Sequence, residues 1–426
     1  MSSSPQVLAG APDGKSDGLF DFYREMDGKG RRTFWACTGG FAMDAMDFMM
    51  FPLIIGTLIA VWKISPATAG GVATVTLWCS AIGGWLAGYL ADRIGRVRVM
   101  QLTILLFSVG SLLAAFAQNP LELTIYRGLL GLGFGGEAAV AAVALSEAVG
   151  AHHRGRAMGF YAASYAVGWG AAVLLQAVIF TTLPPDVAWR VLLAIGAVPA
   201  LLIFYIRRSV EESALSAAVL RQKTDKPSIL EIFSPSNIGA TITGALITIG
   251  AQGGFYSLMI WMPQFLRAER KISNIGSTPY LMSVIGGAFV GYATGGWLAD
   301  RYGRRFVFII SAIAAASLAA VYTHVPFSDR LMLFLGFPLG FFASAYYSAI
   351  LPFLNELFPT AVRGSGVGFT YNAGRAIGGL FPFFVGYVSS WMPLSNAITA
   401  FAFVSYGLML VTAVLVRETN GMALRA

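Results

Sequence analysis

Twelve long apolar stretches constrain this chain more than any other feature of its sequence. A helix needs about 20 mostly apolar residues to cross the hydrocarbon core of a bilayer, and short polar, Gly or Pro segments separate stretches of that kind. Only 12% of the 426 residues are charged, whereas soluble domains carry about a quarter. The sequence therefore predicts an all-α integral membrane protein with twelve transmembrane helices. The predicted spans are residues 33–62, 69–91, 98–117, 121–149, 157–181, 187–206, 237–266, 276–299, 305–325, 329–357, 366–390 and 394–416.

The spans divide into two groups of six around one long polar connection. Placing both termini in the cytoplasm puts most of the 29 Lys and Arg residues in cytoplasmic tails and loops, as the positive-inside rule requires. The same rule explains the net charge of +8 without a nucleic-acid partner. The expected parts are a polar cytoplasmic tail without a secretory signal (1–32), a six-helix bundle (33–206), a cytoplasmic linker with a surface helix near 209–222 (207–236), a second six-helix bundle (237–416) and a cytoplasmic tail (417–426).

One pattern occurs once in each half of the chain. GYLADRIGRVR occupies residues 88–98 and GWLADRYGRRF occupies residues 296–306, each between the second and third span of its half. Such a repeat indicates two parallel copies of one six-helix unit. The pattern resembles the signature of the major facilitator superfamily, and the similarity extends over the whole chain because the repeat, the loop lengths and the number of spans agree. The resemblance implies two six-helix bundles that alternate between conformations.

Charged side chains of the repeat are expected to control that alternation. We expect ion pairs across the two halves to lock one conformation and release it in another; the alternative is a turn that only satisfies the positive-inside rule. Gly88 and Gly296 are expected to allow close helix approach, and the aspartates to end their helices. The predicted gating residues are Asp92, Arg96, Asp300 and Arg304.

The fourth span also resembles the superfamily pattern. It carries Arg127, a glycine stripe (Gly131, Gly133, Gly135 and Gly136) and Glu147 at its cytoplasmic end. The glycines are expected to admit a neighbouring helix closely. The resemblance implies that Glu147 joins the gating charges, and Arg127 is expected to be a structural charge or a proton relay.

A narrower resemblance rests on three segments, which are DAMD at residues 44–47, GGE at 135–137 and ELFPTAVRGSGVGFTYNAGRAIGG at 356–379. Together they look like the metabolite:proton symporters that carry organic acids, including aromatic-acid, sialic-acid and monocarboxylate permeases. Aromatic-acid members usually have D-G-[FY]-D in the first span, where this chain has Ala45 and Met46 between the aspartates.

Three acidic residues lie in the interior of predicted spans, away from the span ends. Even a low insertion scale gives a cost of about 2.5–3.5 kcal/mol for a charged group at the bilayer centre. Asp44 and Asp47 are three positions apart, which brings them to one helix face, and two adjacent carboxylates in a poorly hydrated site discourage double ionisation. We therefore predict that Asp44, Asp47 and Glu137 couple transport to protons. The alternative for the pair is a structural role, beside a basic residue or at a helix break.

The eleventh span contains an arginine near its middle. A guanidinium keeps its charge and forms bidentate pairs with carboxylates, so Arg375 is predicted to anchor an anionic substrate. It is equally well interpreted as a permanent partner of Asp44 or Asp47 across the halves. Polar residues from three spans are expected to complete the substrate site, namely Asn372, Tyr371, Gln252, Tyr256 and Tyr346. Tyr161 and Tyr165 of the fifth span are weaker candidates.

The sequence lacks a phosphate-binding G-x-x-x-x-G-K-[ST] loop, and its three His and two Cys suggest neither a metal site nor a nucleophilic triad. We expect no cofactor and no enzymatic activity. The predicted protein is a monomeric, proton-coupled symporter that carries a small organic acid anion across a bacterial cytoplasmic membrane and contacts lipids and protons besides its substrate. The alternative is a proton-coupled antiporter that exports drugs or metabolites.

Overall fold

The computed structural model describes residues 21–148, 154–207, 229–326, 328–359 and 362–420. Within these helices, the side chains at 21, 91–93, 96–97, 137–140, 142–144, 146–148, 154–156, 198–207 and 229 lie outside the description. The predicted surface helix at 209–222 also lies outside the described residues.

Helices account for the regular structure of the described residues, which confirms the predicted all-α class. The N-terminal half contains α1 (Asp21–Glu25), α2 (Gly28–Trp62), α3 (Pro66–Ile94), α4 (Arg96–Ala115), α5 (Pro120–Ala148), α6 (Arg154–Thr182) and α7 (Pro185–Arg207). The C-terminal half contains η2 (Ile229–Phe233), α9 (Ile238–Met259), α10 (Met262–Ala268), α11 (Thr278–Tyr302), α12 (Arg304–His324), α13 (Asp329–Ala345), α14 (Tyr347–Leu357), α15 (Arg363–Gly378), α16 (Phe381–Val388) and α17 (Leu394–Leu415).

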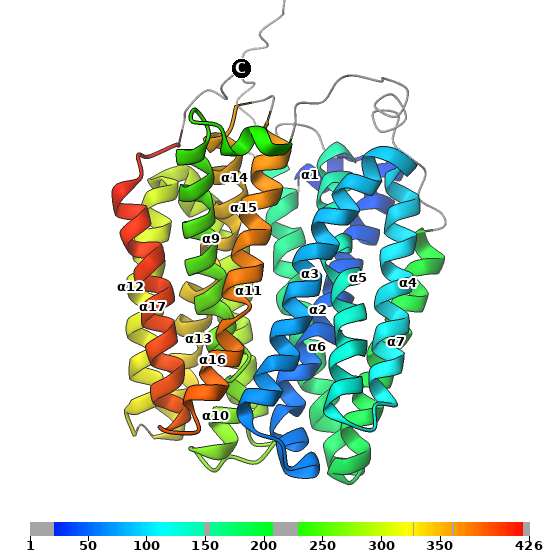
Figure 1. The fold of residues 1–426 in the computed structure, drawn as a ribbon, viewed down its shortest axis with the longest axis vertical. Coiled ribbons are helices and arrows are strands. Elements are labelled where there is room, and N and C mark those ends of the chain that lie inside the picture. The colour runs from blue at the N-terminus through cyan, green and yellow to red at the C-terminus, as the bar shows by residue number, and fades with distance from the viewer. Residues whose placement is uncertain (1–20, 149–153, 208–228, 327, 360–361, 421–426) are drawn as a thin grey trace, which may run out of the picture.

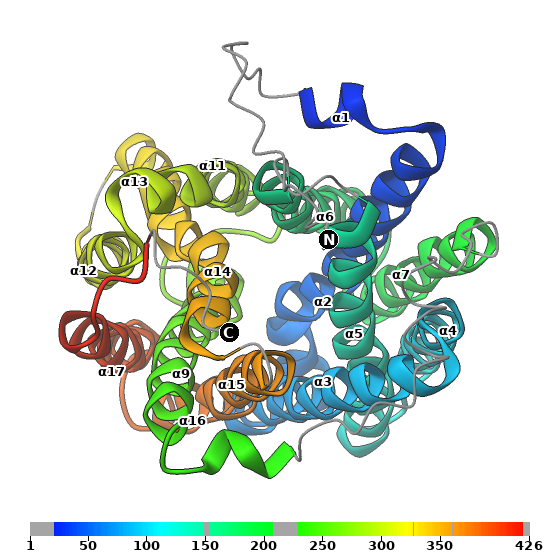
Figure 2. The same ribbon diagram turned by 90° about the horizontal axis from the view of Figure 1, so that it is seen from above.

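The two halves stand side by side with their long helices roughly parallel (Figures 1 and 2). Among the described residues, nine spans formed by one helix or by two consecutive helices are long and apolar enough to cross a membrane. With α5, α7 and the α15–α16 pair they make up the twelve predicted spans. The first span begins at Gly28 rather than at residue 33, so α2 extends into the predicted tail.

Three predicted spans of the C-terminal half are broken rather than continuous. Residues 237–266 form α9 and α10, residues 329–357 form α13 and α14, and residues 366–390 form α15 and α16. Pro263 and Pro382 are the second residues of α10 and α16. A proline lacks the N–H that a continuing helix needs and collides with the carbonyl four residues earlier, so these two interruptions have a local cause.

Glycines of α5 pack against α3 and α4 as predicted. A Cβ at Gly131 would overlap the Thr76 carbonyl oxygen, and one at Gly135 would overlap that of Ser80. The prediction for the repeat glycines was wrong, because nothing lies within 4 Å of a Cβ at Gly88, and the contact at Gly296 is an ordinary 3.8 Å.

The second copy of the repeat forms a charge cluster inside the C-terminal half. Arg304 donates from Nη1 to Asp300 at 2.6 Å and from Nη2 to Glu356 at 3.2 Å. Both partners belong to its own half, so in the described residues Arg304 does not make the predicted bridge between halves. Asp300 does not end its helix either, because α11 continues to Tyr302 and stops at Gly303, whose φ of +101° suits glycine.

Candidate functional site

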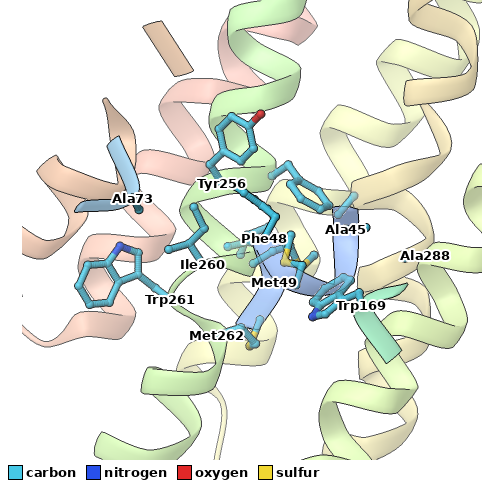
Figure 3. Close-up of a cluster of buried hydrophobic side chains, with 14 of the residues drawn as sticks. Ala45, Phe48, Met49, Ala73, Trp169, Tyr256, Ile260, Trp261, Met262 and Ala288 are labelled. Atoms are coloured by element: carbon cyan, nitrogen blue, oxygen red, sulfur yellow. The ribbon is translucent and has the colours of Figure 1, made fainter. Parts of the chain in front are cut away.

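The centre of the molecule is an apolar contact between the halves. Phe48 and Met49 of α2 lie between Trp169 of α6 and the end of α9, near Tyr256 and Ile260 (Figure 3). Phe48 and Met49 are 3% and 0% exposed. Both side chains belong to the main buried apolar cluster of the molecule.

Arg375 of α15 lies at this interface and is 7% exposed. Its Nη1 donates a 3.0 Å hydrogen bond to Ser80 Oγ on α3, in the opposite half. The guanidinium carbon is 5.6 Å from the centre of the Phe134 ring and 5.4 Å from that of Tyr371. Arg375 Nε is buried and has no hydrogen-bond partner among the described residues. A cation held between two ring faces, with one donor unused, can receive an anion.

Hydrogen bonds connect Gln252 and Tyr256 of α9 to α15, next to Arg375. Gln252 Nε2 donates to the Tyr371 carbonyl oxygen at 2.9 Å, and the Tyr256 hydroxyl donates to Gln252 Oε1 at 3.0 Å. The side chains of Tyr256 and Tyr371 interact electrostatically with Arg375. The structure therefore brings three of the predicted substrate residues together around the guanidinium of a fourth, Arg375.

The other two predicted substrate residues are placed differently. Asn372 donates to the Gly368 carbonyl oxygen at 2.9 Å within α15, and its side chain lies about 3.1 Å from where a Cβ at Gly84 would be. Tyr346 is fully buried and donates to the Ala251 carbonyl oxygen at 2.8 Å. Asn372 thus lies at the α3–α15 contact, whereas Tyr346 binds the backbone of α9.

An aromatic cluster that the sequence only partly suggested spans the halves. Tyr165 of α6 contacts Phe255 of α9 and Tyr292 of α11, with ring centres 6.4 and 6.2 Å apart. Tyr347 contacts the same two rings at 5.5 and 5.8 Å. Three of these contacts are edge-to-face and the Tyr292–Tyr347 contact is tilted, and together the rings supply flat apolar surfaces with hydroxyl groups at their rims. Tyr292, Phe255, Ser80 and Phe134 escaped prediction, because single aromatic or Ser residues in an apolar span carry no distinguishing pattern.

Asp47 lies inside the N-terminal half, away from Arg375. It is 0% exposed, and its Oδ1 accepts a 2.8 Å hydrogen bond from Ser111 of α4. A Cβ at Gly196 of α7 would overlap the same oxygen. Asp47 Oδ2 has no hydrogen-bond partner among the described residues.

Arg127 of α5 shares the region of Asp47. It is 1% exposed, interacts electrostatically with Asp47, and lies 4.9 Å from the centre of the Phe51 ring. Its Nη2 donates to the Phe48 carbonyl oxygen at 3.4 Å, while Nε and Nη1 have no hydrogen-bond partner in the described part of the chain. Asp47 and Arg127 are thus two buried opposite charges without a direct ion pair between their described atoms.

The remaining predicted charges are only partly described. Asp44 is 2% exposed on α2, one turn before Asp47. Glu137 and Glu147 belong to α5, and Asp92 and Arg96 flank the turn between α3 and α4, but these four side chains lie outside the description. Arg375 donates to Ser80 rather than to either aspartate, so the permanent Arg375–aspartate pair is absent among the described contacts.

At the end of the bundle opposite α1, the halves touch tightly (Figure 1). A Cβ at Gly70 of α3 would overlap the Pro382 carbonyl oxygen of α16, and one at Gly386 would overlap that of Pro66. Arg267 of α10 donates to Thr57 Oγ1 of α2 at 3.4 Å. Between these described helix ends, backbone therefore packs directly against backbone at Gly70 and Gly386.

Comparison with known proteins gives the same architecture. The family model described as Major Facilitator Superfamily matches residues 37–381 and 285–423. A "Probable 4-methylmuconolactone transporter" of Cupriavidus pinatubonensis is 36% identical over 95% of each chain. The "Cis,cis-muconate transport protein" of Acinetobacter baylyi is 28% identical over 82% of this chain and 85% of its own. A crystal structure of a D-xylose-proton symporter superposes with a TM-score of 0.72, at 20% identity over 92% of this chain and 99% of that one.

The matches extend over almost the whole chain and both halves. They agree with the repeat, with the helical architecture and with the resemblance of the sequence to organic acid carriers. Enzymatic turnover is not the activity of such proteins, which move solutes across membranes. The chain belongs to the major facilitator superfamily of membrane transporters.

Proposed function

We propose that the protein takes up an organic acid anion together with protons by alternating access. The observation that carries this proposal is Arg375, a buried guanidinium between the two halves with an unused donor at Nε. A buried cation is costly unless a counter-charge reaches it, and a substrate carboxylate supplies that charge. Two relatives are named for transport of 4-methylmuconolactone and of cis,cis-muconate, which supports a carboxylate substrate for this chain.

Protonation of a buried carboxylate supplies the driving force in this proposal. Asp47 is the leading proton site, because it is fully buried and has one oxygen free of hydrogen bonds in the described structure. Asp47 faces Ser111 of α4 and Arg127 of α5, so its charged and neutral forms differ in how strongly they hold α2, α4 and α5 together. Asp44 and Glu137 are further candidates for the same role.

The tight contacts around Gly70 and Pro382 form the closed external gate of this proposal. Both termini then lie in the cytoplasm of a bacterium, and the protein works as a monomer in the inner membrane. Rocking of one half against the other would open this gate and close the opposite end. One of the two states is stabilised by the charges of the two signature loops and by Glu147. These loop charges are Asp92 and Arg96 in the first copy and Asp300 and Arg304 in the second.

Uptake into proteoliposomes tests the proposal. Protein reconstituted with an acidic exterior should accumulate a radiolabelled carboxylate above its external concentration, and a protonophore should abolish that accumulation. Symport makes the outside more alkaline when substrate is added, whereas an exporter working by antiport would show substrate moving against the inward flow of protons. Accumulation that ignores the pH gradient would refute proton coupling.

A further inference from the structure

A hydrogen bond from the N-terminal half ends on the backbone next to Arg375. The indole Nε1 of Trp78 on α3 donates to the Ala376 carbonyl oxygen of α15 at 2.8 Å. Ala376 follows Arg375 directly in the chain, and α3 and α15 are adjacent at the contact between the halves (Figure 2). The bond therefore joins the opposite half to the segment of α15 that carries the proposed anion-binding side chain.

The break between α15 and α16 explains why this carbonyl takes its partner from another helix. In a continuing helix, the N–H of Leu380 would donate to the Ala376 carbonyl. In the described structure, Leu380 N donates to the Ile377 carbonyl at 3.1 Å instead. The preceding carbonyl, that of Arg375, accepts from Gly379 N at 2.9 Å. The helical pattern thus skips the Ala376 carbonyl, and an indole from α3 supplies its donor.

The indole of Trp78 lies on an exposed apolar face of α3. It is 44% exposed, and the exposed side chains of Ile82 and Trp85 follow it on the same helix face, four and seven residues later. Within a span, such a face meets lipid. Hydrocarbon offers no hydrogen-bond partner, so an N–H or a carbonyl that loses its partner there is destabilising. Opening the contact between Trp78 and Ala376 would leave one of each unpaired, which favours a contact that stays closed throughout transport.

The other side of the same α15 turn packs against α9. A Cβ at Gly374 would lie 2.5 Å from Thr248 Cβ, and one at Gly378 would lie 2.7 Å from Gly253 N. These close approaches prevent α15 from shifting further toward α9. The last turn of α15 is thus held from two sides, by α9 of its own half and by the indole from the opposite half.

Resting on the proposed function, we propose that Trp78 is a positioning residue for Arg375. It acts through the backbone of α15 rather than by touching the substrate. Its indole N–H holds the end of α15, and with it the guanidinium, at the same place in both states of the alternating cycle. The contact is then a point about which the halves rock, in contrast to the external contacts at Gly70 and Gly386, which have to open.

Transport from each face of the membrane tests this role. Trp78→Phe keeps most of the ring surface and removes the N–H. The KM for downhill uptake of radiolabelled benzoate, a small carboxylate, should rise about fivefold, which is the usual size of one lost hydrogen bond. The maximal rate should stay within about twofold of wild type, because a bond present in both states does not shift the balance between them.

The rise in KM should be equal in right-side-out and inverted membrane vesicles, which expose opposite faces of the protein. A bond present in only one state would, when lost, favour the other state and change the two KM values in opposite directions. A second measurement needs no substrate. Hydrogen–deuterium exchange of the backbone amides at 376–381 should be faster in Trp78→Phe than in wild type, because the end of α15 has lost one of its two supports.

Trp85→Phe is the matched control. Trp85 is 51% exposed on the same face of α3, and its indole donates no hydrogen bond among the described residues. Both KM values and the amide exchange should therefore stay at wild type.

Unchanged KM values or unchanged exchange in Trp78→Phe would overturn the positioning role. A rise in KM on one face with a fall on the other would identify a latch of a single state and overturn it too, as would equal changes in Trp85→Phe. All of these results leave the proposed function intact if wild-type uptake follows the pH gradient. Wild-type vesicles that take up neither benzoate nor any other carboxylate would overturn the proposed function, and this inference with it.

Discussion

Asp47 and Arg375 are both buried charges, but they are embedded in different parts of the molecule. The described contacts of Asp47 come from α4, α5 and α7, all within the N-terminal half. Those of Arg375 come from both halves, through Ser80 and Phe134 on one side and Tyr371 on the other. The acid is therefore surrounded by one bundle, whereas the arginine lies at the contact between the two bundles.

This difference separates the proposed proton site from the proposed substrate site. A proton on Asp47 does not meet the substrate, so any coupling passes through the protein. One contiguous set of contacts is present: Arg127 donates to the Phe48 carbonyl, the Phe48 ring stacks on Phe134, and Phe134 faces Arg375. Variants of Arg375 and of Asp47 separate the two sites experimentally.

The largest effect is expected at the arginine. Arg375→Gln removes the charge that balances the substrate, and carboxylate affinity should fall by about two orders of magnitude or more. The carboxylate affinity of Arg375→Lys should lie between those of wild type and Arg375→Gln, because lysine keeps the charge but lacks the planar guanidinium with its paired donors. Calorimetric titration with a transported carboxylate measures both. If Arg375→Gln binds the carboxylate with wild-type affinity, the anion does not bind at Arg375.

The next effect concerns energy coupling and leaves binding intact. Asp47→Asn keeps the shape of the side chain and its acceptor for Ser111, but it cannot exchange a proton. Proteoliposomes with this variant should lose uphill accumulation driven by a pH gradient, while substrate exchange across the membrane and carboxylate affinity stay within about threefold of wild type. Loss of affinity as large as that of Arg375→Gln would erase the distinction between the two sites.

The sequence predicted most of the fold and part of the site, for physical reasons. Apolar length and the repeat determine the span pattern, because a bilayer imposes both length and polarity. Charges in apolar spans pointed to Asp47 and Arg375, since such charges are costly without a function. Whether Asp47 and Arg375 belong to one site or to two depends on which helices pack against each face of α2 and α15. That tertiary packing left no trace in the spacing of the residues, and Ser80 is recognisable only once α3 and α15 are adjacent.

A smaller effect is expected from moving the Asp47 carboxylate without removing it. Gly196→Ala adds a methyl group that overlaps Asp47 Oδ1, and overpacking of this kind costs about 1–3 kcal/mol. We expect proton-driven uptake to slow several-fold and thermal stability to fall. Gly407→Ala is the control, because a Cβ there meets nothing within 4 Å. If both variants behave alike, the carboxylate tolerates displacement and its geometry is not critical.

The smallest effect separates the Ser111 hydrogen bond from the burial of its side chain. Ser111→Ala leaves Asp47 Oδ1 without its 2.8 Å donor, which should lower the free energy of unfolding by about 1 kcal/mol. Ser311 of α12 is a matched control, because it is also buried and its Oγ has no partner among the described residues. Removal of an unsatisfied hydroxyl costs nothing in hydrogen bonding, so Ser311→Ala should leave thermal stability equal or higher. Equal losses in the two variants would mean that the serine contributes only volume, and that burial and Arg127 alone hold Asp47 in place.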